Sequence, residues 1–297
     1  MPPPDRPRLR ALVSLLSDDN ARVVADARRA LRDHGAAVLP HLESAIEEGD
    51  AKLRARARLA RDDVRVHLLE SDMRRLRERL DRDPSALEEG CILLARSRDP
   101  ELDPATVRAA LDAMADDLGS RLGPADPPLA VVNAMTRLLA HELGFRGNPR
   151  NYYDPDNSYV HRVLERRTGI PISLSAVYLF VARRLGIPLR GVGMPGHFIL
   201  RYARSEPALF LDPFLGGRVR SEADCRRHLE ENQFGWDPSS LLPIADGAIL
   251  LRMIRNLLLI YRNRGEVARS EVLARLKGAL VGVQVRERGL RGGDGRP

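Results

Sequence analysis

The sequence predicts an α+β fold that is predominantly helical, in which helical-repeat hairpins flank a core with a small antiparallel sheet. Two observations predict it. Apolar residues recur at helical spacing toward both ends of the chain, and short runs that alternate apolar and polar residues are confined to 189–194, 197–202 and 208–212. Strands grouped in one segment, with helices before and after them, are typical of the α+β class.

The N-terminal region, residues 1–70, is expected to form helical hairpins. Its apolar positions keep helical spacing on both sides of a polar break at 17–20. A shift of thirty residues lays Leu42 over Leu12 and Ala57 over Ala27, and this weak repeat resembles the HEAT type. The region is therefore predicted to be a scaffold or contact surface.

The C-terminal region returns to a helical pattern. An apolar stripe that includes Ile249, Met253 and Ile260 predicts a helical hairpin over 241–285, and this hairpin resembles the tetratricopeptide type. The last twelve residues, 286–297, have no apolar face, so we expect them to be disordered.

Composition limits the classes of protein to consider. The chain has 297 residues of which 43% are hydrophobic, enough for two or three packed domains. No apolar run approaches the roughly 20 residues of a membrane-spanning helix, and the first residues lack the apolar centre of a secretory signal. We expect a cytoplasmic protein without a membrane partner.

The charge of the chain raises the question of a nucleic-acid partner. The formal net charge is +7, and clustered basic residues bind phosphates. However, acidic residues interrupt the arginines, and aromatic residues make up only 4% of the sequence, too few for base-stacking platforms. The pattern argues against nucleic-acid binding, which would require a contiguous arginine face.

The middle of the chain, residues 71–240, is predicted to contain the site. An apolar helix is expected over 171–185, and the alternating runs that follow it predict strands. His197 and Asp212 lie on neighbouring runs, so an antiparallel hairpin brings them together. In papain-type cores, a Cys at the N-terminus of the central helix precedes such a His, which acts as the base, and an Asp, which orients the His.

Several motifs of this region together resemble a known family. They are Glu142-Leu143-Gly144-Phe145, Asn148, Tyr152-Tyr153-Asp154-Pro155, Asn157-Ser158-Tyr159, Gly169-Ile170-Pro171-Ile172-Ser173-Leu174-Ser175, Tyr178, Pro195-Gly196-His197-Phe198, Leu211-Asp212-Pro213-Phe214 and Gly216-Gly217. With them, residues 71–240 resemble the bacterial SirB-type transglutaminase-like domain, which is also related to a part of some F-box proteins. The resemblance implies a papain-like core with a nucleophilic Cys at the start of the central helix.

This sequence has no cysteine at that position. Counting back from Gly186, which closes the central helix, the matching residue is Pro171, a residue favoured in the first turn of a helix. A serine could replace the thiol: Ser173 is expected to point away from this face, and Ser175 returns to it one turn further along. Both serines could equally be small residues that pack the helix.

The two cysteines of the chain, Cys91 and Cys225, offer no clear substitute for the missing nucleophile. They form no CxxC spacing, so neither a disulfide framework nor a zinc site is expected. Cys91 lies in an apolar helix and is expected to be a small core residue. Cys225 lies at a helix start that Ser221 can cap, and its arginine neighbours are expected to lower its pKa.

The candidate site therefore consists of two groups. The catalytic candidates, if the protein is an enzyme, are His197, Asp212, Ser175 and Ser173. The candidate cleft or binding residues are Asn148, Tyr152, Tyr153, Asn157, Tyr178 and Gly196. Alternatively, His197 is a buried hydrogen-bonded residue, and the Asn and Tyr residues fix a loop. The other histidines lack ligand spacing, so no metal or cofactor is expected.

Two functions remain open. The leading hypothesis is a transglutaminase-like protein without catalysis, which binds a protein or peptide in the former substrate cleft and uses its helical hairpins for further contacts. The alternative is a hydrolase or acyltransferase in which Ser175 or Ser173 is activated by His197 and Asp212. No signal of an oxyanion hole is seen in the sequence, and the oligomeric state is not specified.

Overall fold

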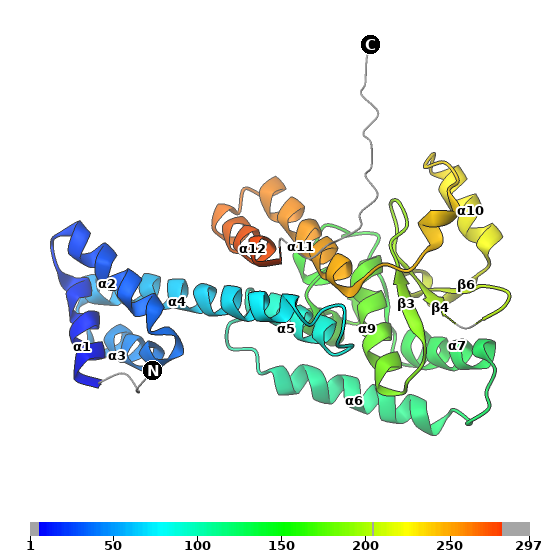
Figure 1. The fold of residues 1–297 in the computed structure, drawn as a ribbon, viewed down its shortest axis with the longest axis horizontal. Coiled ribbons are helices and arrows are strands. Elements are labelled where there is room, and N and C mark those ends of the chain that lie inside the picture. Colours follow the sequence, from blue (N-terminus) through cyan, green and yellow to red (C-terminus); the bar gives the residue numbers. More distant parts are fainter. Residues whose placement is uncertain (1–5, 204, 281–297) are drawn as a thin grey trace, which may run out of the picture. The chain divides into compact units, whose positions relative to one another are not determined.

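The computed structural model describes residues 6–203 and 205–280 (Figure 1), so the tail expected at 286–297 lies outside the described residues. The chain divides into two compact units, Met1–Arg74 and Arg75–Pro297. Each unit has its own apolar core, and the candidate site belongs to the second unit.

The first unit is built from helices. They are α1 (Arg6–Ser14), η1 (Leu15–Ser17), α2 (Ala21–Asp33), η2 (Gly35–Val38), α3 (Leu39–Glu48) and the first part of α4 (Ala51–Arg77). Leu16, Leu31, Val38 and Leu42 are fully buried in its core. Asn20 begins α2, because its side chain accepts a hydrogen bond from the Arg22 amide.

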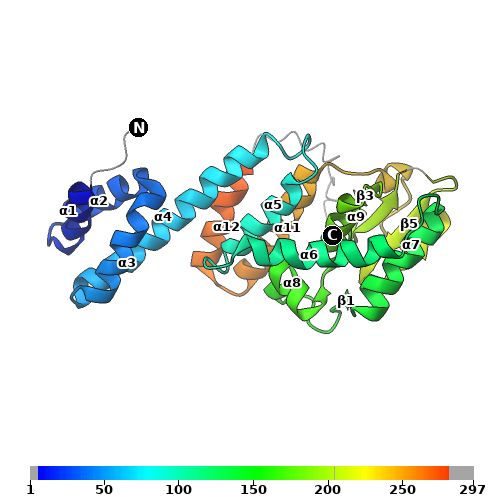
Figure 2. The ribbon, with the colours of Figure 1, turned by 90° about the horizontal axis from the view of Figure 1, so that it is seen from below.

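The helices of the second unit include one that is buried along most of its length. They are α5 (Ala86–Arg96), α6 (Pro104–Ser120), α7 (Pro128–Thr136), the π-helical turn η3 (Arg137–Glu142), α8 (Val160–Arg166), α9 (Pro171–Arg184), α10 (Glu222–Glu231), α11 (Asp246–Asn263) and α12 (Val267–Leu280). Every residue of 171–182 in α9 is buried, and α9 contacts α6, α8 and α11. The hairpin α11–α12 packs on α5 through α11 (Figure 1, Figure 2).

A small antiparallel sheet lies next to α9. Its strands β3 (Leu189–Val192), β4 (Ile199–Tyr202), β5 (Leu209–Asp212) and β6 (Arg218–Arg220) are adjacent in sequence order. The first three match the alternating runs of the sequence, whereas β6 was not expected. A two-residue parallel pair, β1 (Arg146–Gly147) with β2 (Thr168–Gly169), ties the loop before α8 to the start of α9. The predicted class, α+β and predominantly helical with a small antiparallel sheet, is confirmed.

The two faces of this sheet are covered by different elements. Helix α9 contacts β3 and β4, and α10 contributes Cys225 and Leu229 to a cluster with Ile199 and Phe210. Since side chains alternate along a strand, Asp212 lies on the same face as Phe210. The end of β5 on the α10 face is therefore where the candidate residues converge.

The helices of the described residues were also searched for a membrane span. Within 6–203 and 205–280, no helix combines the length and the apolar character that crossing a bilayer requires.

Candidate functional site

His197 and Asp212 are in direct contact. Nε2 of His197 lies 2.8 Å from Oδ2 of Asp212, and only 8% of the His197 side chain and none of the Asp212 side chain is exposed. Strands β4 and β5 pair with Leu200 opposite Leu211. This register brings His197 close to Asp212, because it places the turn before β4 beside the end of β5. The structure thus brings together the two catalytic candidates that the hairpin spacing suggested.

The turn that presents His197 is held from both sides. Gly196 has a φ of +69°, a left-handed conformation that favours glycine, and the His197 amide donates to the carbonyl of Met194 at 3.2 Å. From α11, Nη2 of Arg252 donates to the carbonyls of His197 and Met194 at 2.9 and 3.1 Å. The imidazole is therefore fixed by its backbone as well as by Asp212.

A third buried charge completes the centre. Nε of Arg220 lies 3.1 Å from Oδ2 of Asp212, close enough for an ion pair although outside hydrogen-bond geometry. Arg220 is opposite Phe210 in β6, so its side chain is on the same face as Asp212. The other oxygen, Oδ1, accepts from the Leu215 amide at 3.2 Å. The Asp212 carboxylate is thus shared among an imidazole, a guanidinium and an amide.

A second histidine lies beside the first. The ring centroids of His228, on α10, and His197 are 5.2 Å apart. Burial lowers the pKa of His228, and the nearby His197 and Arg220 lower it further. The surroundings of His228 therefore disfavour its protonation.

The start of α9 has the proline that the sequence placed there. Pro171 is in the first turn, and Ser173, the third residue of the helix, reaches back to the Ile170 backbone at the N-cap. The Ser173 hydroxyl lies 2.5 Å from the carbonyl of Asn157 and accepts from the Ile170 amide at 3.1 Å. These bonds occupy Ser173 in joining the helix to the preceding loop.

Ser175 is in a different situation. Its hydroxyl is fully buried and has no hydrogen-bond partner among the described residues. The same is true of the Tyr178 hydroxyl, one turn further along α9, and burial raises the pKa of Tyr178. Neither Ser173 nor Ser175 is hydrogen-bonded to His197, so the structure does not assemble the Ser-His-Asp arrangement.

The polar candidates of the 148–157 loop bond to one another. Nδ2 of Asn148 donates to Oδ1 of Asn157 at 3.1 Å, and Nδ2 of Asn157 donates to the Asn151 carbonyl at 2.7 Å. Asn157 is completely buried. Asn148 and Asn157 thus fix the loop, which is one of the two roles considered for them.

Aromatic rings connect this loop to His197. The ring centroid of Phe214 lies 6.1 Å from that of His197 and 6.1 Å from that of Tyr152. Tyr152 contacts Tyr153 at 5.3 Å, and Tyr153 is 63% exposed. Burial raises the pKa of Tyr152. The row runs from the surface to the buried His–Asp centre.

Gly196 lies under another aromatic ring. A Cβ at Gly196 would lie 2.6 Å from the ring of Phe234, whose own side chain is 47% exposed. Leu215, next to Phe214 in the chain, is also 47% exposed. Apolar side chains therefore reach the surface on two sides of the His–Asp centre.

Sequence reasoning missed four residues of this site: Phe214, Arg220, His228 and Phe234. Phe214 belongs to a quoted motif but received no role. The Gly216-Gly217 turn followed by alternating Arg218, Val219 and Arg220 is a hairpin signal that could have indicated Arg220. No sequence signal indicates His228 or Phe234, because tertiary packing alone brings them to His197.

Neither cysteine is placed to act as a nucleophile. Sγ of Cys91 is buried and 3.7 Å from Sδ of Met253, and burial raises the pKa of Cys91. Cys225 is packed under the sheet, and burial raises its pKa to about 12. The expectation that neighbouring arginines lower the pKa of Cys225 is wrong, because the loss of solvent on burial outweighs the opposing effect of Arg220. In the described residues, no group of three or more His, Cys, Asp and Glu side chains could hold a metal ion.

Comparisons with known proteins extend this description. Residues 105–255 match the family model for the transglutaminase-like superfamily. A UPF0162 protein of Xylella fastidiosa (strain 9a5c) is 38% identical over 178 residues, which cover 58% of this chain and 63% of the relative. A UPF0162 protein of Pseudomonas aeruginosa is 34% identical over 193 residues, which cover 63% of this chain and 69% of the relative.

Eukaryotic proteins are also among those similar to this chain. F-box only protein 21 of Homo sapiens is 35% identical over 147 residues, which cover 46% of this chain and 22% of the human protein. The match with the Xylella relative spans less than two thirds of that protein's length. No solved structure gives a significant match.

Proposed function

This chain belongs to the transglutaminase-like superfamily and to the UPF0162 proteins, and we propose that it is a non-catalytic member that binds a protein or peptide segment. One observation carries the proposal. Within residues 6–203 and 205–280, Asp212 is the one hydrogen-bond partner of the His197 ring. A base that activates a serine or cysteine nucleophile needs that hydroxyl or thiol within hydrogen-bond reach.

The charge around His197 supports the same proposal. An orienting aspartate assists catalysis by stabilising the imidazolium that forms when the histidine takes a proton. Here Arg220 already forms an ion pair with Asp212 at 3.1 Å, and the His228 ring lies 5.2 Å from that of His197. Asp212 is therefore engaged by a permanent cation as well as by His197, and this arrangement fits a structural ion-pair network.

The surface around this centre has the character of a contact site. We propose that the partner lies along the aromatic row of Tyr153, Tyr152 and Phe214. It also covers Phe234 and Leu215, since aromatic and apolar side chains dominate the binding energy of protein interfaces. The burial of His197 and Asp212 beneath these residues means that the partner contacts the rim of the centre.

The flanking helices extend the proposal. We infer that the SirB-type relationship holds, that the hairpins within Met1–Arg74 are HEAT-like, and that the α11–α12 hairpin is tetratricopeptide-like. Helical hairpins of these kinds offer extended contact surfaces. In this proposal the protein is a regulatory module of the cytoplasm with a peptide or protein partner.

The test is a peptide selection against the full chain. Random peptides displayed on phage are selected for binding, and the affinity of the synthesised winners is measured by fluorescence anisotropy. Replacing Leu215 or Phe234 by Ser should weaken binding by about tenfold, as expected for a buried apolar anchor.

Leu129→Ser is the matched control. Leu129 lies on α7 and is 52% exposed, so the substitution changes exposed apolar surface away from the centre and should leave affinity unchanged. A selection without binders, or binders that respond equally to all three substitutions, would remove the rim of the His197 centre from consideration.

A further inference from the structure

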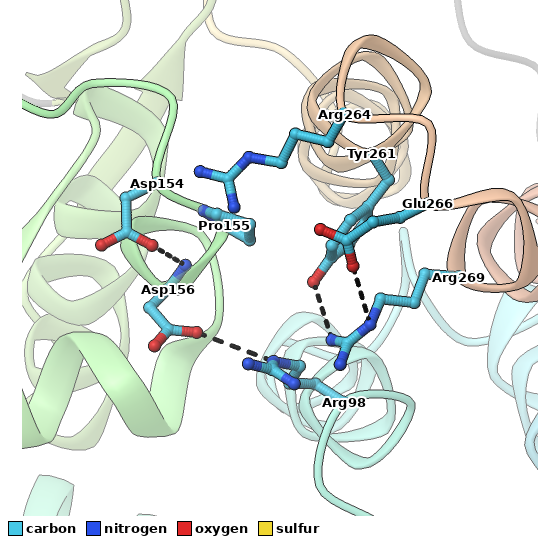
Figure 3. Close-up of a pocket in the computed structure, with 8 residues that line it drawn as sticks. All are labelled: Arg98, Asp154, Pro155, Asp156, Tyr261, Arg264, Glu266 and Arg269. Atoms are coloured by element: carbon cyan, nitrogen blue, oxygen red, sulfur yellow. Dashed lines mark hydrogen bonds and ion pairs between the residues drawn. The ribbon is translucent and has the colours of Figure 1, made fainter.

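A pocket lies away from His197, where the loop after α5, the turn η4 (Pro155–Asn157) and the α11–α12 connection meet (Figure 3). Its volume is about 230 Å³. The lining residues are Arg98, Asp154, Pro155, Asp156, Tyr261, Arg264, Glu266 and Arg269. Charged and polar side chains from three separate elements thus face one space.

The carboxylates of Asp154 and Asp156 in this pocket are paired with arginines. Asp154 forms an ion pair with Arg166 at 2.8 Å, and Asp156 forms one with Arg162 at 3.3 Å, both from α8. Asp154 also caps η4 by accepting from the Asp156 amide. These two carboxylates therefore contribute little net negative charge to the pocket.

Two of the pocket arginines have partners of their own. Arg269 contacts Glu266 at 3.0 Å and donates to the Tyr261 hydroxyl at 3.4 Å. Arg98 lies 3.7 Å from Asp156, a carboxylate that Arg162 also contacts. A guanidinium has five N–H donors in a fixed fork, so neither arginine is saturated by these contacts.

Of the three arginines that line the pocket, Arg264 has the least negative charge close to it. Nη2 of Arg264 donates to the carbonyl of Tyr153 at 3.1 Å, and no described carboxylate lies within ion-pair distance of it. Figure 3 shows its guanidinium reaching toward Pro155 without an interaction to the labelled acids. A cation that is held by a neutral carbonyl retains donors for an anion.

An apolar hollow adjoins the other side of Arg264. Tyr153, Ile260, Asn263 and Arg264 line this second pocket, which has a volume of about 200 Å³. Tyr153 is 63% exposed, and Leu259, next to Ile260, is 54% exposed. Because Arg264 lines both pockets, a positive site and an apolar site share one wall.

We propose that these paired pockets bind a peptide in which an anionic side chain is adjacent to an apolar one. The anion accepts hydrogen bonds from Arg264, with Arg98 and Arg269 supplying further positive charge, and the apolar side chain packs on Tyr153 and Ile260. A planar fork suits a carboxylate and a phosphate alike. This site shares Tyr153 with the aromatic row that leads to His197, but it uses none of His197, Leu215 and Phe234.

The experiment measures the affinity of three labelled peptides for the full chain by fluorescence anisotropy. The peptides have the sequence Gly-Ser-Leu-X-Gly-Ser, where X is Glu, phosphoserine or Gln. We expect the Glu or phosphoserine peptide to bind at least about tenfold more tightly than the Gln peptide, the difference typical of charge-assisted hydrogen bonds. The tighter of the two identifies the anion as carboxylate or phosphate.

Variants then locate the site. Arg264→Gln should remove the preference for an anion, whereas Arg262→Gln should retain it, because Arg262 is an exposed arginine at the end of α11, two residues before Arg264, that does not line the pocket. Replacing the peptide leucine by Ser should weaken binding severalfold. Equal binding of the Gln peptide, or equal losses in the two arginine variants, would overturn the proposal.

Discussion

Arg220 and Asp212 form a buried ion pair at the end of the sheet, with Nε 3.1 Å from Oδ2 and with 8% and 0% of their side chains exposed. The same oxygen contacts His197. An ion pair of this kind is costly to leave half made, because the remaining charge has lost its water without regaining a partner. Asp212 is therefore expected to stabilise the fold whatever its chemical role.

Replacing Asp212 by Asn tests this expectation. Asn keeps the shape of the side chain but leaves Arg220 without a counter-charge, which should lower the free energy of unfolding by about 3–5 kcal/mol. Urea unfolding followed by the fluorescence of Trp236, the single tryptophan, reports on the core that packs under this sheet. Asp117→Asn, at an exposed pair with Arg121, is the control and should change little. Similar effects of the two substitutions would contradict the expectation.

The pKa of His228 predicts a sensitivity to acid. Burial lowers the folded pKa of His228 below its ordinary value of 6.5, and Arg220 and His197 add to the shift against the opposing effect of Asp212 and Glu231. Between the folded and unfolded values, the unfolded chain binds a proton that the folded chain does not. The contribution to stability is therefore complete above about pH 6.5 and is lost as the pH falls below it.

His228→Gln removes this titration. The variant should lose less stability than the unmodified protein when the pH is lowered from about 7 to about 5, as measured by urea unfolding at each pH. His161, whose pKa burial also lowers, still titrates in the variant, so the slope should become shallower without vanishing. An unchanged slope would mean that His228 is equally easy to protonate in both states.

The parts of this site that sequence could predict are those fixed by local patterns. Apolar periodicity predicts α9, the proline at Pro171 and the capping box at Ser221 predict helix starts, and alternation predicts β3 to β5. The spacing of His197 and Asp212 along the chain predicts that a hairpin brings them together, and in the structure Nε2 of His197 lies 2.8 Å from Oδ2 of Asp212. Each of these depends on residues near one another in the chain.

The remaining features depend on how distant elements pack. Arg220 reaches Asp212 because β6 adds a fourth strand in one particular register. His228 approaches His197 because α10 covers that face of the sheet. The pocket at Arg264 combines elements separated by more than one hundred and fifty residues. Local patterns in a single sequence do not predict which distant elements pack against each other.

The environment of the cysteines predicts their reactivity. A thiol reacts as the thiolate, and burial raises the pKa of both Cys91 and Cys225, the latter to about 12. Neither should react with Ellman's reagent in the folded protein at neutral pH, and both should react in guanidinium chloride. Rapid release of one equivalent from the folded protein would reveal an accessible thiol and would reopen cysteine catalysis.

Ser173 and Ser175 provide a matched pair on one helix for the stability of α9. Ser173→Ala removes the bonds of the hydroxyl to the Ile170 amide and the Asn157 carbonyl, which keep only their bond to each other at 3.3 Å, so the substitution should cost about 0.5–1.5 kcal/mol of unfolding free energy. Ser175→Ala removes a buried hydroxyl that has no partner among the described residues, so stability should stay within about 0.5 kcal/mol of the unmodified protein or increase. Urea unfolding of both variants measures the difference.

The same two serines also allow a test that distinguishes a non-catalytic binding protein from an enzyme. If His197 activates a serine, a fluorophosphonate probe should label the folded chain, and labelling should be lost in His197→Ala and in one of the two serine variants. We expect no labelling that depends on His197, since its ring hydrogen-bonds to Asp212 and to neither serine. A hydroxyl within a buried core also has no path to the probe, and both serines are at most 1% exposed. Labelling that His197→Ala abolishes while circular dichroism stays unchanged would establish catalysis and would overturn the non-catalytic proposal.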